Sequence, residues 1–355
     1  MVAVDTFVAL SKWTVFNPLL AIAWLACEAL SPHLVAEYRH LLALPCLILL
    51  GWTLTWSSAA WTNHPRLPRI QASQWKRELV VVTGGATGIG AHLALKLARR
   101  GAKVVTLDIQ KADYASLGAA APAQTELDDI TPNIHPYICD VASLDALTKV
   151  VKSIRALHGD PTILINNAGI TNSRPLVECS AAEVTKLLNV NLASPLWLIQ
   201  SLLPGMLAAA EAGRACHIVS VSSIMGHVGI SKMVDYCASK HGLVGLHRAL
   251  RYEIRSHHRT HRIRTTLVIL GHVRTRLFAG IYFNPLARFL APSIEPEHVA
   301  ERIVEAIDAR REGTIALPWY ANWTEGLAVL PSWGADAVQW MSGANTSFDA
   351  MHKAR

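Results

Sequence analysis

The stretch that decides the fold runs from Leu79 to Gly90 and reads L-V-V-V-T-G-G-A-T-G-I-G. A run of β-branched residues is followed by glycines and then by a stretch with helical periodicity. This is the strand, turn and helix order of a pyrophosphate site. Glycines allow a tight turn close to phosphates, and a helix N-terminus offers unpaired N–H groups and a positive dipole end. A glycine-rich turn alone is weak evidence, because many strand-to-helix joins use glycine. The stretch predicts dinucleotide contacts from residues of the turn, namely Gly84, Thr87, Gly88, Ile89 and Gly90.

A carboxylate ends the next apolar run, at Asp108. In a dinucleotide site this position accepts hydrogen bonds from the adenosine ribose and repels a 2′-phosphate, so Asp108 predicts NAD rather than NADP. The alternative is a solvated acid that caps the next turn, and nearby Lys103 and Lys111 leave some room for phosphate. Asp140 and Val141 end the third run, where Asp140 is a candidate to hold the adenine amino group or, alternatively, a loop acid before the next helix.

From Glu78 onward, short β-branched runs alternate with stretches of helical period, which is the pattern of βαβ units. We expect strands near residues 79–83, 103–107, 134–138, 162–165, 215–221, 264–270 and 314–317. We expect helices near residues 88–100, 143–157, 181–210, 235–256 and 296–311. The insertion Lys111 to Thr131 is rich in alanine and acids, which favours a surface loop with one helical turn. The pattern predicts an α/β fold with a doubly wound, Rossmann-like parallel sheet.

A tyrosine and a lysine stand one helical turn apart in Tyr236-Cys237-Ala238-Ser239-Lys240. Such residues share a helix face, but pairs of this kind arise by chance on many helices. Ser223 adds weight, because it lies at the end of the preceding predicted strand. Together the three residues form a candidate catalytic group.

This ordered set of residues resembles the short-chain dehydrogenase/reductase family over about Leu79 to Leu317. The matching positions are the glycine motif Thr83 to Gly90, the segment Asn166-Asn167-Ala168-Gly169, and the single residues Asn191, Ser223, Tyr236 and Lys240. One departure is Leu270-Gly271, where the family usually has Pro-Gly. The departure concerns the geometry of that loop more than the cofactor.

The resemblance implies further contacts with a nicotinamide cofactor. The segment after the fourth strand shapes the cofactor floor, with contacts from Asn167, Ala168 and Gly169. The carboxamide end of the nicotinamide meets the loop from Val273 to Thr275, with contacts from these two residues.

The resemblance also gives each catalytic residue a role. A tyrosine with a pKa of about 10 is a poor base at neutral pH, so the Lys240 ammonium and the positive oxidised nicotinamide must stabilise the Tyr236 phenolate. Lys240 also holds the nicotinamide ribose, and Asn191 holds a water through which protons reach solvent. Ser223 hydrogen-bonds the substrate oxygen and positions it. Tyr236 then removes the hydroxyl proton of an alcohol as hydride leaves, or donates it in the reverse direction.

The N-terminal region predicts a membrane helix. The composition is 51% hydrophobic and 17% charged, and the apolar excess is local. Leu41 to Trp61 has no charged residue and is long enough to cross roughly 30 Å of hydrocarbon. The alternative is a buried core helix, but Trp52, Trp56 and Trp61 gather toward one end, as at a membrane interface. A second apolar stretch, Trp13 to Cys27, spans the membrane, lies in the interface or forms one arm of a hairpin.

Cationic residues follow that segment at Arg66, Arg69, Lys76 and Arg77. Cationic flanks stay on the cytosolic side of a membrane, so we expect the catalytic domain to face the cytosol. The formal charge of +7 fits either nucleic acid or an anionic membrane surface. Because an apolar anchor is present, we interpret the charge as a membrane property and predict no nucleic-acid partner.

Neither a disulfide framework nor a metal site is predicted. The six cysteines lack paired spacing, which fits a reducing compartment; they are Cys27, Cys46, Cys139, Cys179, Cys216 and Cys237. The stretch Arg255 to Arg264 contains three histidines without acidic or thiol partners. We interpret it as a solvated helix end.

Beyond Leu317 the chain is rich in tryptophan and poor in charge. Three interpretations stay open: core-packing filler, a substrate lid, and an amphipathic strip on lipid headgroups. With the N-terminal anchor, this extension resembles the membrane-bound branch of retinol dehydrogenases and lipid-associated hydroxysteroid dehydrogenases. The resemblance implies a lipophilic alcohol or its carbonyl partner as substrate, contact with membrane lipid, and a location at the endoplasmic reticulum or lipid droplet; it also allows a homodimer.

We therefore divide the chain into an anchor region at 1–62, a basic linker at 63–78, a catalytic domain at 79–317 and a Trp-rich extension at 318–355. The leading hypothesis is NAD-linked oxidation of a lipophilic alcohol. The alternatives are an NADPH-linked ketone reductase of lipid synthesis and a non-catalytic membrane scaffold that binds lipid. The intact group of Ser223, Tyr236, Lys240 and Asn191 speaks against a scaffold, which has no need of all four.

Overall fold

In the computed structural model, the chain divides into two compact units, Met1–Arg66 and Leu67–Arg355. The structure describes residues 66–114, 127, 129–281, 291–343 and 345. The predicted anchor at Leu41 to Trp61 and most of the insertion Lys111 to Thr131 lie outside the described residues.

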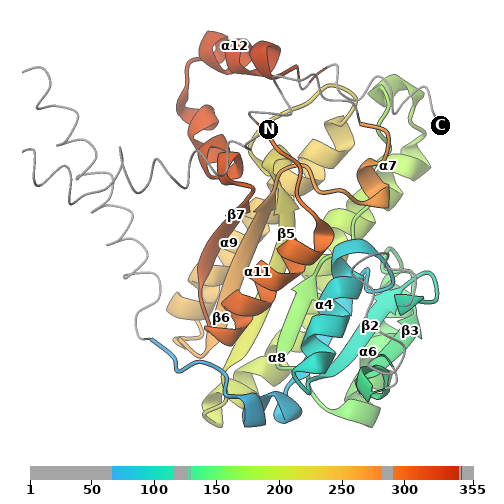
Figure 1. Ribbon diagram of the computed structural model, residues 1–355, viewed down its shortest axis with the longest axis vertical. Coiled ribbons are helices and arrows are strands. Elements are labelled where there is room, and N and C mark those ends of the chain that lie inside the picture. The colour runs from blue at the N-terminus through green and yellow to red at the C-terminus, as the bar shows by residue number, and fades with distance from the viewer. Residues whose placement is uncertain (1–65, 115–126, 128, 282–290, 344, 346–355) are drawn as a thin grey trace, which may run out of the picture. The chain divides into compact units, whose positions relative to one another are not determined.

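Seven parallel strands form one sheet in the order β3-β2-β1-β4-β5-β6-β7 (Figure 1). The strands are β1 (Leu79–Thr83), β2 (Lys103–Asp108), β3 (Ile134–Ile138), β4 (Ile163–Asn166), β5 (Cys216–Ser223), β6 (Ile263–Leu270) and β7 (Gly313–Leu317). The chain order reverses between β1 and β4, and ligands of such sheets bind outside the carboxyl ends of the strands at that point. The predicted doubly wound sheet is confirmed.

Helices cover both faces of this sheet. The described α-helices are α4 (Gly88–Arg99), α6 (Leu144–His158), α7 (Ala181–Leu188), α8 (Ser194–Glu211), α9 (Val234–Ser256), α11 (Pro296–Asp308) and α12 (Ser332–Ser342). The 3₁₀ and π-helical segments are η1 (Ala72–Arg77), η4 (Thr131–Asn133), η5 (Leu176–Glu178), η6 (Asn189–Ala193), η7 (Ile224–Gly226), η8 (Arg276–Phe278) and η9 (Trp319–Val329).

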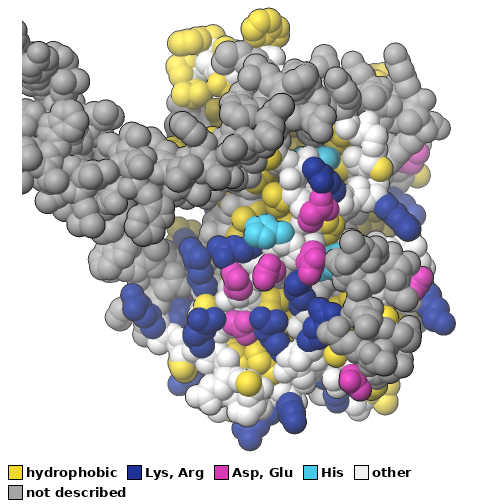
Figure 2. Space-filling view, in the orientation of Figure 1, with side chains coloured by type: hydrophobic (Ala, Val, Ile, Leu, Met, Phe, Trp, Pro, Cys, Tyr) yellow, Lys and Arg dark blue, Asp and Glu magenta, His cyan; other side chains and the backbone are white. Residues whose placement is uncertain are grey.

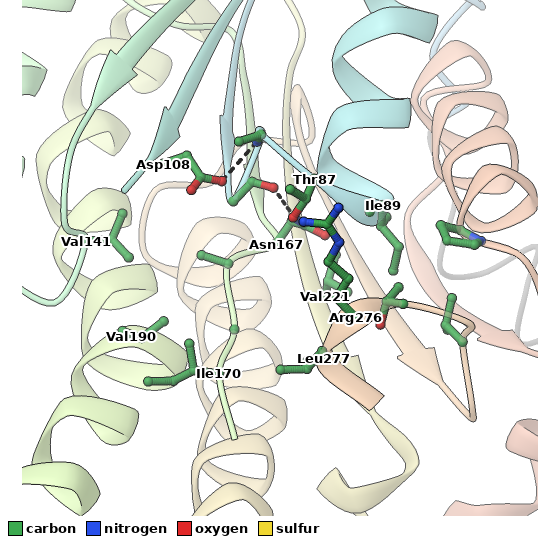
Figure 3. Close-up of a pocket in the computed structure, with 18 of the residues that line it drawn as sticks. Thr87, Ile89, Asp108, Val141, Asn167, Ile170, Val190, Val221, Arg276 and Leu277 are labelled. Carbon is green, nitrogen blue, oxygen red and sulfur yellow. Dashed lines mark hydrogen bonds between the residues drawn. The ribbon is translucent and has the colours of Figure 1, made fainter. Parts of the chain in front are cut away.

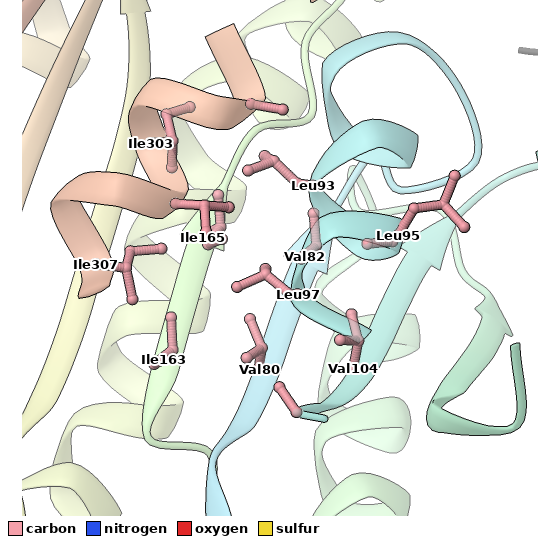
Figure 4. Close-up of a cluster of buried hydrophobic side chains, with 14 of the residues drawn as sticks. Val80, Val82, Leu93, Leu95, Leu97, Val104, Ile163, Ile165, Ile303 and Ile307 are labelled. Carbon is pink, nitrogen blue, oxygen red and sulfur yellow. The ribbon is translucent and has the colours of Figure 1, made fainter. Parts of the chain in front are cut away.

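Two apolar clusters hold the layers together, one on each face of the sheet. Successive strand residues point to opposite faces, so Val80 and Val82 of β1 pack with Leu93 of α4 and Ile303 of α11 (Figure 4). On the other face, Val81 packs in the cluster formed with α6, α8 and α9. Because both faces are covered, β1 is buried throughout and reads as a continuous aliphatic run.

The predicted helix at 181–210 is not uniform. It consists of α7, the π-helical turn η6, and α8. Within the described residues, Ala181–Glu211 is also the stretch that is long and apolar enough to cross a membrane, with a mean hydropathy of 1.4. Leu198 and Leu202 of α8 are buried in the cluster on the sheet, so we assign this stretch to the core of the fold.

Two segments are more tightly packed than their sequences predict. Trp75, in the predicted linker, is buried, and its Nε1 donates a hydrogen bond to Asp308 Oδ1 at 3.1 Å. The prediction of a solvated helix end at Arg255 to Arg264 is wrong for its two terminal arginines. Arg255 and the buried Arg264 both form ion pairs with the buried Glu312, at 2.7 and 3.2 Å. The charge of Glu312, distant in sequence, allows these arginines to leave solvent.

Candidate active site

A cavity of about 910 Å³ opens at the carboxyl ends of the central strands (Figure 3). Fifteen of the predicted site residues line it: Gly84, Thr87, Gly88, Ile89, Asp108, Asp140, Val141, Asn167, Ala168, Gly169, Ser223, Tyr236, Lys240, Val273 and Thr275. Gly90 and Asn191 do not line it, although both contact residues that do. The structure therefore brings the predicted residues together around one cavity.

The glycine turn after β1 has a backbone that other residues do not adopt easily. Gly84 has a φ of +65°, which is in the left-handed region that favours glycine. At Gly90, a Cβ atom would lie 2.0 Å from the carbonyl oxygen of Gly84. The first turn of α4 is therefore pressed against the glycine turn, with its N-terminus at the cavity.

Hydrogen bonds between Asn167, which follows β4, and the end of β1 hold this turn in place. The Asn167 Nδ2 donates to the carbonyl oxygens of Thr83 and Gly84, at 2.9 and 3.2 Å. In return, the Thr83 hydroxyl accepts hydrogen bonds from the backbone N–H groups of Asn167 and Ala168, both at 3.0 Å. These contacts join the ends of β1 and β4 and fix the position of the turn between them.

Each predicted nucleotide-binding carboxylate also caps a local turn. Asp108 Oδ2 accepts a hydrogen bond from the backbone N–H of Ala86 at 2.9 Å (Figure 3), and Oδ1 accepts one from Gln110 at 3.2 Å. Asp140 Oδ1 accepts one from Ala142 at 2.9 Å. Both residues line the cavity. Capping and ligand contact are therefore compatible, because a carboxylate has about four lone-pair sites.

The candidate catalytic residues converge from β5 and α9. Ser223 is the last residue of β5, and its hydroxyl accepts a hydrogen bond from the Met225 N–H at 3.2 Å. Tyr236 and Lys240 lie one turn apart on α9, with the Lys240 Nζ 5.5 Å from the centre of the Tyr236 ring. The Lys240 Nζ also donates to the carbonyl of Val221 at 3.0 Å, which ties α9 to β5.

Burial shifts the pKa of both α9 residues. It raises the pKa of the Tyr236 hydroxyl above its ordinary value of 10.0, and a hydrogen bond with Ser223 opposes part of this increase. It lowers the pKa of Lys240 to about 8. At neutral pH the lysine is therefore still mostly charged, and its ammonium group favours the phenolate form of Tyr236. The site can hold a proton on Tyr236 and stabilise the tyrosine after the proton leaves.

Asn191 lies in the π-helical turn η6, and its side chain fixes two parts of the site. Its Oδ1 accepts a hydrogen bond from the backbone N–H of Ile170 at 2.9 Å. Its Nδ2 donates to the carbonyl of Ile170 at 3.0 Å and to Ser239 Oγ at 3.1 Å. A Cβ atom on Gly169 would lie 3.6 Å from the Asn191 Oδ1 and 3.7 Å from the Lys240 Nζ. Asn191 thus positions the loop next to Lys240. π-helical turns are frequent at functional sites, but nothing in the sequence predicted this one.

In the Leu270-Gly271 pair, the glycine lies against the C-terminal segment. A Cβ atom on Gly271 would lie 2.1 Å from the Tyr320 hydroxyl. The backbone N–H of His272 donates to that hydroxyl at 3.0 Å. The C-terminal segment therefore supports the loop that carries Val273 and Thr275, a contact that the sequence did not predict.

The residues that make one end of the cavity apolar were not predicted from the sequence. Ile170, Val190 and Leu277 lie together at the end opposite Asp108 (Figure 3). The Phe278 ring meets the Tyr236 ring edge to face, with 5.9 Å between their centres. Their place in the sequence could have identified these residues, because each lies within three positions of a predicted site residue. Tyr236 itself packs in an apolar cluster with Leu187, Met225, Ile230, Met233 and Cys237.

The site fits a dinucleotide with a nicotinamide ring. The glycine turn and the start of α4 suit phosphates, and Asp108 suits a ribose. The Lys240 ammonium is buried, and burial is the cause that lowers its pKa, with no contribution from a carboxylate. Its N–H groups can therefore donate to a ribose hydroxyl. Gly169 leaves the space beside this ammonium open.

Gly90 gives a test of this fit. We expect Gly90→Ala to weaken dinucleotide binding by about tenfold or more, because the new Cβ pushes the first turn of α4 away from Gly84. The matched control is Gly245→Ala, an exposed glycine within α9 with no atom in the way. The control should keep its affinity and gain about 0.5–1 kcal/mol of stability. Titration calorimetry measures the affinities, and equal affinities in both variants would contradict the assignment.

Comparisons with known proteins agree with this geometry. The family model described as short chain dehydrogenase matches residues 78–283. Retinol dehydrogenase 10-B of Danio rerio is 30% identical over 271 residues, which cover 72% of this chain and 77% of that protein. Human 17-beta-hydroxysteroid dehydrogenase 13 is 30% identical over 245 residues, which cover 69% of this chain and 76% of that protein.

Among solved structures, a metagenomic short-chain oxidoreductase in complex with NADP superposes with a TM-score of 0.52 at 30% identity. The match covers 67% of this chain and 94% of that one. The residues matched by the family model, 78–283, include β1 to β6, α9 and all of the predicted site residues.

Proposed function

Because the chain belongs to the short-chain dehydrogenase family, we propose that it oxidises a lipophilic alcohol, or reduces the matching carbonyl, at a membrane with NAD as cofactor. The observation that carries this proposal is the convergence of Ser223, Tyr236 and Lys240 at the apolar end of the cavity. A retinoid, a steroid or another lipid alcohol fits such a site, and the names of the relatives support this substrate class.

The mechanism follows from the side chains. The chemistry that a nicotinamide would supply when bound is hydride transfer, from the alcohol in the oxidation and to the carbonyl in the reduction. Ser223 hydrogen-bonds the substrate oxygen and sets its distance from the reacting carbon. Tyr236 takes the hydroxyl proton during oxidation and returns it during reduction. Lys240 stabilises the phenolate with its charge and would hold the nicotinamide ribose, and Asn191 holds the loop beside Lys240. The apolar residues around Tyr236 exclude water from the proton transfer.

The membrane location is supported by the uncharged segment Leu41 to Trp61 and by the cationic residues that follow it. We place the catalytic domain on the cytosolic side, at the endoplasmic reticulum or lipid droplet. A catalytic role is favoured over a lipid-binding scaffold because a buried ammonium is costly to the fold. A scaffold would gain nothing from a buried ammonium that destabilises the fold.

The cofactor preference depends on Asp108. Its negative charge opposes a 2′-phosphate at short range, so we expect NAD to be preferred over NADP. The variant Asp108→Asn keeps an acceptor for the Ala86 N–H and loses the charge. We expect this variant to reduce the ratio of kcat/KM for NAD to that for NADP by about tenfold. A wild-type preference for NADPH would contradict the assignment and favour a ketone reductase.

The general test is turnover of a panel of lipid alcohols and ketones by membranes that contain the full chain, with each cofactor in turn. We expect cofactor reduction with at least one lipid alcohol and NAD. Absence of turnover across the panel, with cofactor binding intact, would overturn the proposed function.

A further inference from the structure

Three tryptophans of the C-terminal segment are exposed. Trp323 in η9 and Trp333 and Trp340 in α12 are 69%, 74% and 83% exposed. Trp333 and Trp340 are about two turns apart and share one face of α12. Hydrophobic side chains at the position of α12 stand out from the surrounding surface in Figure 2. We call these three side chains the tryptophan surface.

The part of the segment that does not carry this surface is attached to the rest of the fold. Ala321 of η9 is buried against Leu267 and Ile269 of β6. The core-packing interpretation is therefore correct for this part of η9, but not for the exposed tryptophans. Because η9 is fixed to the sheet, the tryptophan surface has a defined place on the catalytic unit.

α12 is bound to the chain that leads into the catalytic helix. The Gln339 side chain donates a hydrogen bond to the Gly229 carbonyl. The backbone N–H of Ser231 donates to the Asn345 Oδ1 at 3.0 Å. Ile230, between these two contacts, is buried in the apolar cluster around Tyr236. α12 therefore lies against the wall of the apolar end of the site.

The chemistry of this surface favours lipid as its partner. Tryptophan combines a large apolar ring with an N–H donor and is enriched where membrane meets water. Residues 318–343 contain two acids, Glu325 and Asp336, and no lysine or arginine. Glu325 is paired with Arg248. Few charges would lose water on contact, and the absence of cations favours a zwitterionic headgroup region over an anionic partner.

The N-terminal segment makes such a weak surface effective. Residues Leu41 to Trp61 have the length and composition of an anchor. A tethered domain meets the membrane at a high effective concentration, so a second contact needs little affinity of its own.

We propose that the tryptophan surface docks the catalytic unit on the membrane, with α12 and the Gly229–Ser231 segment at the lipid face, so that substrate passes from lipid to Tyr236 without entering bulk water. This inference rests on the proposed function, because it assumes a substrate that dissolves in lipid.

The direct test is photolabelling of the full chain in nanodiscs that contain phosphatidylcholine with a photoactivatable acyl chain. We expect label on peptides from residues 319–343 and none on α6. The triple variant Trp323→Ala, Trp333→Ala, Trp340→Ala should lose about fivefold or more of that label and keep the label on Leu41 to Trp61. The triple tyrosine variant should restore it, since tyrosine also favours the interface. If the lipid label on residues 319–343 is no higher than on α6, the proposal is overturned. The same holds if α12 cross-links to a second copy of the chain and not to lipid.

Kinetics test the route of the substrate. We expect the triple alanine variant to lower kcat/KM for a membrane-dissolved alcohol by about fivefold and to leave a short water-soluble alcohol unchanged. The matched control is Leu157→Ala with Tyr252→Ala, two exposed apolar side chains on α6 and α9, which should change neither. Equal losses for both alcohols would overturn the route from lipid. If no alcohol is a substrate, the proposed function fails, while the photolabelling still decides whether the surface meets lipid.

Discussion

Replacement of Tyr236 by phenylalanine should lower kcat by about a thousandfold or more, because the variant lacks the group that carries the proton. The ring keeps its edge-to-face contact with Phe278 and its place in the apolar cluster. Ser223 keeps its hydrogen bond from Met225. The fold and the cofactor affinity should therefore survive, within about twofold for the dissociation constant. Steady-state kinetics with a lipid alcohol and titration of the cofactor measure the two quantities.

Tyr252→Phe is the matched control, because Tyr252 is an exposed tyrosine on the same helix. It should leave both quantities unchanged. If Tyr236→Phe keeps more than about a tenth of the wild-type kcat, another group carries the proton and the catalytic assignment fails.

Replacement of Lys240 by methionine should reduce kcat by about a hundredfold or more and also weaken cofactor binding. The first effect follows because the Tyr236 phenolate loses its neighbouring charge, and the second because the nicotinamide ribose loses its donor. The same variant should be more stable than the wild type at neutral pH. Burial lowers the pKa of Lys240 from 10.5 to about 8, so the charged lysine destabilises the fold fully below pH 8.

This destabilisation should decrease as the pH rises from about 8 to 10.5, the window between the folded and unfolded pKa values. Unfolding of the cofactor-free protein in denaturant should show a stability gain for Lys240→Met of up to about 3 kcal/mol at pH 7 that shrinks across this window. Lys152→Met, on the exposed side of α6, is the control and should show neither effect. A variant with unchanged cofactor affinity would confine Lys240 to tuning Tyr236.

Much of the fold could be predicted because the sequence pattern of each element agrees with its place in the fold. β1 is buried on both faces, so its sequence is aliphatic throughout, and the glycines that follow are required by the contact between Gly84 and Gly90. The sequence contains no comparable sign of the π-helical turn at Asn191. The Asn191 side chain in that turn is hydrogen-bonded to Ile170 and Ser239, which are distant in sequence.

The same reasoning applies to the site. Residues within motifs, such as Ser223, Tyr236 and Lys240, could be predicted because their chemistry fixes their identity and spacing. The apolar wall of Ile170, Val190 and Leu277 could not, because an apolar residue serves equally well in a core. The support of the Val273 loop by Tyr320 was also hidden, since it joins the loop after β6 to the segment after β7.

Charged residues show a third limit of prediction from sequence. Arg255 and Arg264 belong to a run that looks solvated, and only the fold brings Glu312 to both of them. A charge run can therefore be interpreted from sequence only when its partners are local.

The most direct test of the account is isotope transfer. A lipid alcohol with deuterium on its carbinol carbon is incubated with full-chain membranes and NAD, and the nicotinamide product is analysed by mass spectrometry. We predict that deuterium appears in the reduced cofactor with the wild type and not with Tyr236→Phe. Reduced cofactor without deuterium, or equal transfer by both proteins, would contradict hydride transfer from the alcohol at the Tyr236 site.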